Sequence, residues 1–128
     1  MATLDRAADL KARTKSFAIR IVRLYRSLPR STDAQVLGRQ LLRSGTSVAA
    51  NYRAACRSRS KAEFISKMSV VLEEADESAF WLELMAETGT LVSSRTEALL
   101  KETNELVAIF GASIRTAKAF KSFRHLVI

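Results

Sequence analysis

The stretch KAEFISKMSVVLEEADESAFWLELMAET, residues 61–88, decides the fold class. Its apolar side chains recur every three or four residues, the spacing at which side chains share one face of an α-helix. That stripe consists of Phe64, Met68, Val71, Ala75, Ala79, Leu82 and Met85 or Ala86. Ser60 and Glu63 have the S-x-x-E spacing of a capping box, and Gly89 stands where helices commonly stop. The stretch therefore predicts a long amphipathic helix over 61–88.

Three further helices are expected around this one, over about 4–27, 34–56 and 93–118. Their predicted core residues are Phe17, Ile21, Leu24 and Leu28, then Val36, Leu37, Leu41, Leu42, Val48 and Tyr52, then Leu99, Leu106, Phe110 and Ile114 or Ala117. Breaks fall at Pro29, in RSRS (57–60) and at Gly89, because proline and glycine interrupt helices. Four long helices with short connections predict one all-α domain over 1–128, an antiparallel up-down-up-down four-helix bundle followed by a tail over 119–128.

Gly45 lies in the middle of the expected helix 34–56, amid the small residues of RSGTSVAANYRAAC (43–56). Glycine inside a helix costs about 1 kcal/mol relative to alanine. Such a position is expected to permit a local kink or a close crossing with another helix.

The charge of the chain is distributed unevenly. Residues 1–60 hold 13 Lys and Arg against 3 Asp and Glu, a net +10, whereas residues 61–128 hold 8 against 10, a net −2. A small protein with a net charge of +8 often meets a polyanion. The N-terminal segment carries charges throughout, and no apolar run is long enough to span a bilayer, so neither a signal peptide nor a membrane contact is expected. With a single cysteine, a cytoplasmic location is predicted.

Basic side chains of the first two helices and the connection that follows are the candidate nucleic-acid contacts. They are Arg20, Arg23, Arg26, Arg43, Arg53, Arg57, Arg59 and Lys61. Arginine forks suit phosphate groups, and few aromatic residues lie among them, so contact with the RNA or DNA backbone is favoured over base-specific recognition. If the two helices are neighbours, these residues are expected to form one basic surface.

The acidic run EEADE (73–77) supports an alternative function. A protein–protein interaction scaffold would use its basic and acidic faces to bind a partner protein or neighbouring subunits. Trp81 and Phe80 are expected to be core or interface anchors.

No catalytic constellation is recognisable, so an enzyme is not expected. The chain has one histidine, His125, and no E-x-x-H pair for a di-iron site, and no glycine-rich phosphate loop is present. Cys56 lies beside Arg53 and Arg57, which would lower a thiol pKa, but without a nearby histidine base it is expected to be a half-buried helix residue. No cofactor and no metal are predicted.

The segment LLRSGTSVAANYRAACRSRSKAEFISKMSVVLEEADESAFWLELM resembles the bacterial four-helix-bundle family of proteins encoded in intervening sequences of 23S rRNA genes. Leu42, Arg43, Ser47 and Asn51 match its pattern L-R-R-A-x-x-S-x-x-x-N-I-A-E-G. SKAEF matches the following helix start, and Ser78 with WLEL corresponds to its S-x-x-E-L region. The chain departs from the family where Ala54 and Ala55 replace the E-G pair.

The resemblance implies a ring-shaped homo-oligomer, a pentamer, without catalytic residues. A related branch consists of accessory proteins of diversity-generating retroelements, basic pentamers that bind a reverse transcriptase and nucleic acid. For this chain, the resemblance suggests that Ser44, Ser47, Ala50 and Asn51 allow close packing at a bundle or subunit seam. Together with the aromatic anchor Trp81, Ser47 and Asn51 are the predicted interface residues.

Overall fold

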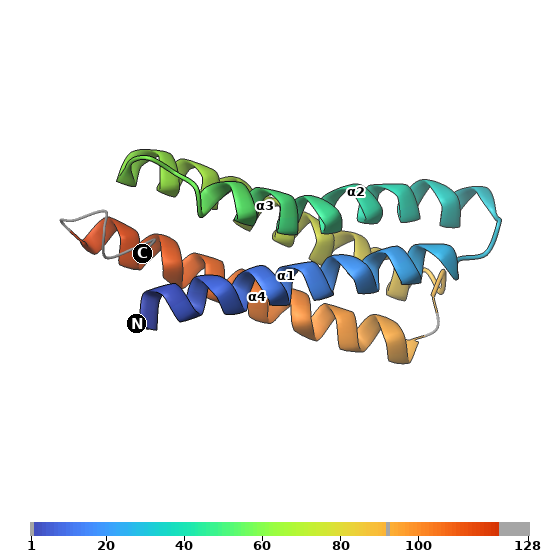
Figure 1. The fold of residues 1–128 in the computed structure, drawn as a ribbon. Helices are drawn as coiled ribbons and strands as arrows, with labels where there is room; N and C mark the ends of the chain where they lie inside the picture. The colour runs from blue at the N-terminus through green and yellow to red at the C-terminus, as the bar shows by residue number, and fades with distance from the viewer. Residues whose placement is uncertain (1, 92, 121–128) are drawn as a thin grey trace.

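The computed structural model describes residues 2–91 and 93–120, and it consists of four helices in an antiparallel bundle (Figure 1). The helices are α1 (Ala2–Arg26), α2 (Thr32–Ala55), α3 (Lys61–Glu87) and α4 (Ser93–Ala119). The all-α up-down-up-down bundle predicted from the sequence is confirmed, and each helix boundary lies within two residues of the predicted one. The predicted tail falls mostly on 121–128, outside the described residues.

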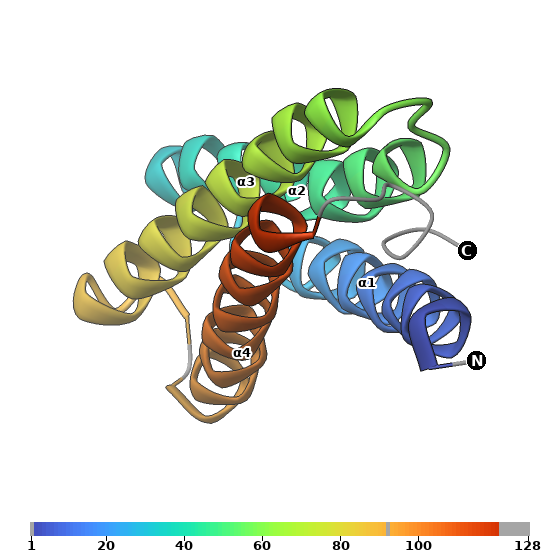
Figure 2. The same cartoon turned by 90° about the vertical axis from the view of Figure 1, so that its left-hand side faces the viewer.

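The four helices do not contact one another equally. α2 packs along both α1 and α3, and α4 packs along α3, whereas α1 and α4 make few contacts. Figure 2 shows α1 and α4 diverging from each other on the side of the bundle opposite the α2–α3 pair. α2 and α3 therefore form the spine to which the two outer helices attach.

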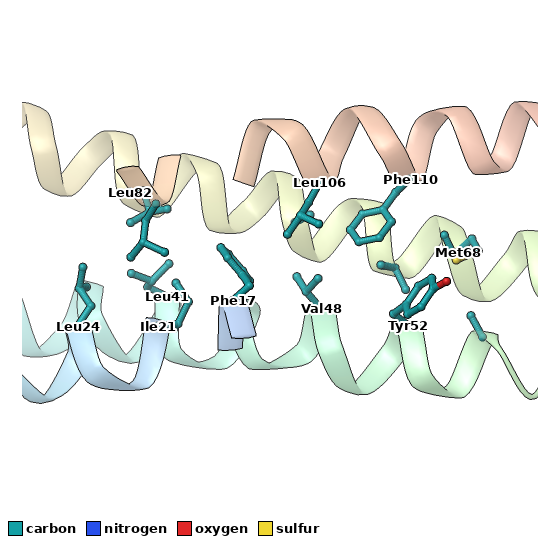
Figure 3. Close-up of a cluster of buried hydrophobic side chains, with 14 of the residues drawn as sticks. Phe17, Ile21, Leu24, Leu41, Val48, Tyr52, Met68, Leu82, Leu106 and Phe110 are labelled. Carbon is teal, nitrogen blue, oxygen red and sulfur yellow. The ribbon is translucent and has the colours of Figure 1, made fainter. Parts of the chain in front are cut away.

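The core lies between these helices and runs along the bundle (Figure 3). The predicted apolar stripes of α1, α3 and α4 are buried. Of the alternatives left open, Met85 is buried and Ala86 is exposed, whereas Ile114 and Ala117 are both buried. The rings of Tyr52 and Phe110 stack with their centroids 6.0 Å apart, which joins α2 to α4. The prediction for Val36 is wrong, because its side chain is 47% exposed and Gly38 faces α1 instead.

Both ends of α3 are closed as the sequence predicted. Ser60 Oγ accepts a hydrogen bond from the Glu63 amide at 3.1 Å, and the Glu63 carboxylate reaches back to the amide of Arg59 at 3.3 Å. At the other end Gly89 has a φ of 70°, and the amides of Gly89 and Thr90 donate to carbonyls of the last turn. The first bond is the Ser60 half of a capping box, whereas the Glu63 carboxylate bonds the residue before the N-cap. The bonds at Gly89 and Thr90 are those of a Schellman motif.

Two glycines of α2 allow α1 to approach closely. A Cβ at Gly45 would lie 2.8 Å from Ile21 Cγ1, and a Cβ at Gly38 would lie 2.3 Å from Leu28 Cδ1. Both distances are far below van der Waals contact. Of the two alternatives expected for Gly45, the close helix crossing is therefore confirmed.

Ser44, the neighbour of Gly45, faces α3 instead of α1. Its hydroxyl oxygen lies 2.9 Å from the hydroxyl of Ser78, which also bonds the Glu74 carbonyl at 2.9 Å. Both serines are fully buried. A hydrogen-bonded pair of this kind fixes the register of α2 on α3, because an unpaired hydroxyl at the same depth would be costly.

We expect Gly45→Ala to lower the free energy of unfolding by about 1 kcal/mol. Overpacking costs about 1–3 kcal/mol, and the gain in helix propensity returns about 1 kcal/mol. Ile21 cannot move aside, because it is fully buried and its β-branched side chain is confined to one helical rotamer. Urea denaturation measures the change.

Gly111→Ala in α4 is the matched control. The nearest atom to a Cβ there is the Arg115 Nη1 at 3.4 Å, so helix propensity alone should stabilise the protein by up to about 1 kcal/mol. If both variants are stabilised equally, α1 does not pack on Gly45 as described.

Candidate nucleic-acid interface

The antiparallel arrangement places six of the eight predicted basic residues at the two ends of the bundle. Arg53, Arg57, Arg59 and Lys61 lie where α2 ends and α3 begins, which we call the α2–α3 end. Arg23 and Arg26 lie in the last turn of α1, at the α1–α2 end. α2 has 24 residues and is about 36 Å long, so these groups do not form the single basic surface expected from the sequence.

Arg20 lies between the two ends, on α1. It is exposed, and it is close enough to Glu102 of α4 to contribute to the low pKa of that carboxyl group.

Arg43 is held in an ion-pair network on the α2–α3 seam. Its guanidinium contacts the carboxylate of Glu74 at 3.2 Å and also bonds that of Glu77. The Trp81 Nε1–H donates to Glu77 at 3.0 Å. The indole hydrogen bond and the guanidinium lower the pKa of Glu77 below its ordinary value. Arg43 is thus engaged by carboxylates of its own chain.

Lys61 closes the C-terminal end of α4. Its ammonium donates hydrogen bonds to the carbonyl oxygens of Lys118, at 3.3 Å, and Phe120. A cation is favourable there, because the last carbonyls of a helix carry partial negative charge. The contact links the first turn of α3 to the last turn of α4.

Arg53, Arg57 and Arg59 remain as the exposed basic group of the α2–α3 end. None of the three side chains forms an ion pair with another described residue, and all three residues are exposed to solvent. We call these three arginines the free arginine cluster.

The predicted interface residues occupy two neighbouring helices. Asn51 and Ser47 are half-buried on α2, where the Asn51 side-chain Nδ2 donates to the Ser47 carbonyl at 2.9 Å. Trp81 is half-buried on α3, and its ring meets that of Phe80 edge-on with centroids 5.0 Å apart. Phe80 is 52% exposed.

Phe80 shares the solvent-facing side of α3 with acidic residues. This α3 outer face comprises Val70, Glu73, Asp76, Phe80 and Glu83, all of which are exposed. Phe80 and Val70 are the large apolar side chains that this face exposes, at 52% and 39%.

Arg13 forms a contact that the sequence did not indicate. Its guanidinium grips Glu102 of α4 with two hydrogen bonds, Nε to Oε2 at 2.8 Å and Nη2 to Oε1 at 2.7 Å. It also contacts Glu105 at 3.1 Å. The hydrogen bond from Arg13 lowers the pKa of Glu102. Because α1 and α4 touch little elsewhere, this fork is their main described polar link.

We expect Arg13→Gln to lower the free energy of unfolding by about 0.5–1 kcal/mol at pH 7, given the partial exposure of the pair. The pKa of folded Glu102 is depressed below its ordinary value of 4.5. The contribution of the Arg13–Glu102 pair to the free energy of unfolding is therefore fully present above about pH 4.5. It is lost as the pH falls through the pKa of folded Glu102.

Denaturation of the wild type and Arg13→Gln at pH 7 and at about pH 3 measures this. Arg23→Gln, which removes an exposed arginine of the same helix, is the control and should change stability little. A gap between wild type and Arg13→Gln that is equal at both pH values would contradict the role of Glu102.

Cys56 is the residue that the sequence offered as a possible nucleophile. Cys56 is half-buried, and burial raises its thiol pKa, opposite to the shift that activates a nucleophile. Within 2–91 and 93–120, no three His, Cys, Asp or Glu side chains are grouped so as to hold a metal ion. His125 lies outside these ranges. No helix of the same part of the chain has the length and apolar character needed to cross a bilayer.

The profile of the 23S rRNA-intervening sequence protein family matches residues 7–112. The chain belongs to this family. A solved structure of similar fold is that of a protein with unknown function from the S23 ribosomal protein family of Bacteroides thetaiotaomicron. The two chains are 35% identical and superpose with a TM-score of 0.79, over 85% of this chain and 97% of the other. No curated protein matches the chain.

Proposed function

We propose that this member of the family is a non-enzymatic cytoplasmic protein that binds the backbone of RNA or DNA through its unpaired arginines. The proposal rests on one observation: some basic residues are held in ion pairs within the chain, and others are not. Arg13 and Arg43 are paired with carboxylates, whereas Arg53, Arg57 and Arg59 are exposed and form no ion pair with a described residue. The charge of Arg59 does contribute to the low pKa of Glu63. Guanidinium groups that the fold does not use are available to phosphates.

The surroundings of the free arginine cluster favour contact with phosphate over contact with bases. Tyr52, the aromatic residue nearest in sequence, is only 5% exposed and stacks inside the bundle. Phe120, which is 39% exposed, is the exposed aromatic residue at this end, and its carbonyl oxygen accepts a hydrogen bond from Lys61. Binding through the three arginines themselves should be tolerant of sequence and strongly dependent on salt.

A homo-oligomer would strengthen this interaction. The family resemblance supports a pentameric ring, in which each copy adds its own arginine cluster to one assembly. Linked copies bind a polyanion far more tightly than one copy, because later contacts become intramolecular. The resemblance to retroelement accessory proteins also makes a reverse transcriptase a candidate partner.

Replacing the free arginine cluster by glutamine tests the proposal. Arg53→Gln, Arg57→Gln and Arg59→Gln together should weaken binding to structured RNA and duplex DNA. They should also reduce the slope of log affinity against log salt by about 0.9 for each duplex phosphate that the protein no longer neutralises. Fluorescence anisotropy measures both quantities.

Arg43→Gln is the control, because it also removes a positive charge but from a side chain that already contacts two carboxylates. It should leave the salt slope nearly unchanged. Equal slopes for the wild type and the triple variant would show that the cluster does not contact phosphate.

A second candidate function is a protein-interaction scaffold, and the α3 outer face favours it. Phe80 is exposed on this acidic face, while the first half of the chain carries a net charge of +10. The face is therefore complementary in charge to the basic half of a neighbouring copy, or to a basic partner protein.

We expect Phe80→Ser to break the oligomer. Five copies of the 14.2 kDa chain give about 71 kDa, and loss of an exposed aromatic anchor should shift the mass toward that of one copy. Analytical ultracentrifugation measures the mass. Ile19→Ser on α1 is the matched control, since Ile19 is 42% exposed and lies outside this face. An unchanged mass for Phe80→Ser excludes the α3 outer face as the subunit contact.

A further inference from the structure

A hollow at the α1–α2 end is distinct from the free arginine cluster. It has a volume of about 440 Å³ and is lined by Tyr25, Arg26, Leu28, Arg30 and Gln35. The hollow is shallow and open to solvent, so a ligand there would be covered on one side only.

The walls of the hollow are held in place by contacts to the two helices. The Tyr25 ring lies against Gly38 of α2, where a Cβ would be 3.1 Å from Tyr25 Cδ1. The Tyr25 hydroxyl approaches Gln35 Oε1 at 3.4 Å, and Gln35 Nε2 donates to the Pro29 carbonyl at 2.9 Å. Pro29 has a fixed φ, so the connection that carries Arg30 is restricted as well.

The polar groups of the hollow are mainly donors. Arg26 and Arg30 are exposed and form no ion pair with the described residues. Asp33 is the acidic residue in the first turn of α2. Its carboxylate is engaged by the Ser31 hydroxyl and the Ala34 amide, which lower its pKa. The hollow therefore offers two guanidinium groups whose charge is not neutralised by a salt bridge.

We propose that this hollow binds the terminal phosphate of a nucleic-acid strand, with the terminal nucleotide against Tyr25 and Leu28. The proposal rests on the nucleic-acid binding proposed above and assigns a different part of the ligand to a different end of the bundle. The two arginines contact the phosphate oxygens. The half-buried phenol ring of Tyr25 provides most of the apolar surface for the base, because Leu28 is only 8% exposed.

The charge of the site favours a strand end over an internal phosphate. A terminal phosphomonoester carries about −1.5 to −2 charges at pH 7 and has three acceptor oxygens, whereas an internal diester carries one charge. Two guanidinium forks match the dianion. The arginines of the α2–α3 end are instead exposed on the surface, where they suit the continuous backbone.

Three otherwise identical single-stranded oligonucleotides test the proposal, one with a 5′-phosphate, one with a 3′-phosphate and one with hydroxyl groups at both ends. The full-length protein should bind one of the two phosphorylated strands at least about tenfold more tightly than the hydroxyl strand, as charge-assisted hydrogen bonds predict. Fluorescence anisotropy at a fixed salt concentration measures the ratio.

Variants assign the effect to the hollow. Arg26→Gln with Arg30→Gln should bring the ratio to about one, and Arg30→Gln alone, at an exposed connection, should reduce it without affecting the fold. The control, Arg53→Gln with Arg57→Gln, should weaken binding of all three strands and preserve the ratio.

Two results would overturn the inference while leaving backbone binding intact. One is equal, measurable binding of the three strands by the wild type, and the other is a ratio that survives in the Arg26→Gln, Arg30→Gln variant. Absence of binding of every strand, even at low salt, would overturn the proposed function together with this inference.

Discussion

The bundle depends on how closely α2 approaches its two neighbours at residues 44 and 45. Gly45 allows the fully buried Ile21 of α1 to lie against the α2 backbone, and Ser44 bonds Ser78 of α3 on the other side. Larger side chains at either position would force α1 or α3 outward. Ser44 and Gly45 are therefore part of an internal seam of the bundle, whereas Ala50, in the same stretch of small residues, is exposed.

The uneven charge of the chain is partly compensated inside the molecule. The carboxylates that pair with Arg13 and Arg43 come from α4 and α3, in the mildly acidic second half of the chain. These pairs tie the two halves together and leave other arginines of the first half without acidic partners. If the fold neutralised its own surface, no exposed arginines would be left outside ion pairs. These arginines are the reason for proposing an external polyanion as the ligand.

Local patterns predicted what depends on local physics. The helical stripes, the N-cap at Ser60 and the stop at Gly89 follow from side-chain spacing and backbone conformation, and the structure confirms them. The ion pairs of Arg43 and the carbonyl contacts of Lys61 link residues 31 to 59 positions apart, so no local pattern indicates them. The separation of the arginines arises because antiparallel helices place their opposite ends together. The hollow beside Tyr25 could not be predicted either, because it forms only when α1 packs on α2.

The most direct test of the central claim is the salt dependence of nucleic-acid binding by the unmodified protein, with its mass determined on the same sample. We expect binding to structured RNA and duplex DNA whose logarithm falls linearly with log salt between about 50 and 300 mM, with little preference for sequence. An intact oligomer that binds neither nucleic acid at the lowest salt would contradict the account, and the exposed arginines would then serve a protein partner.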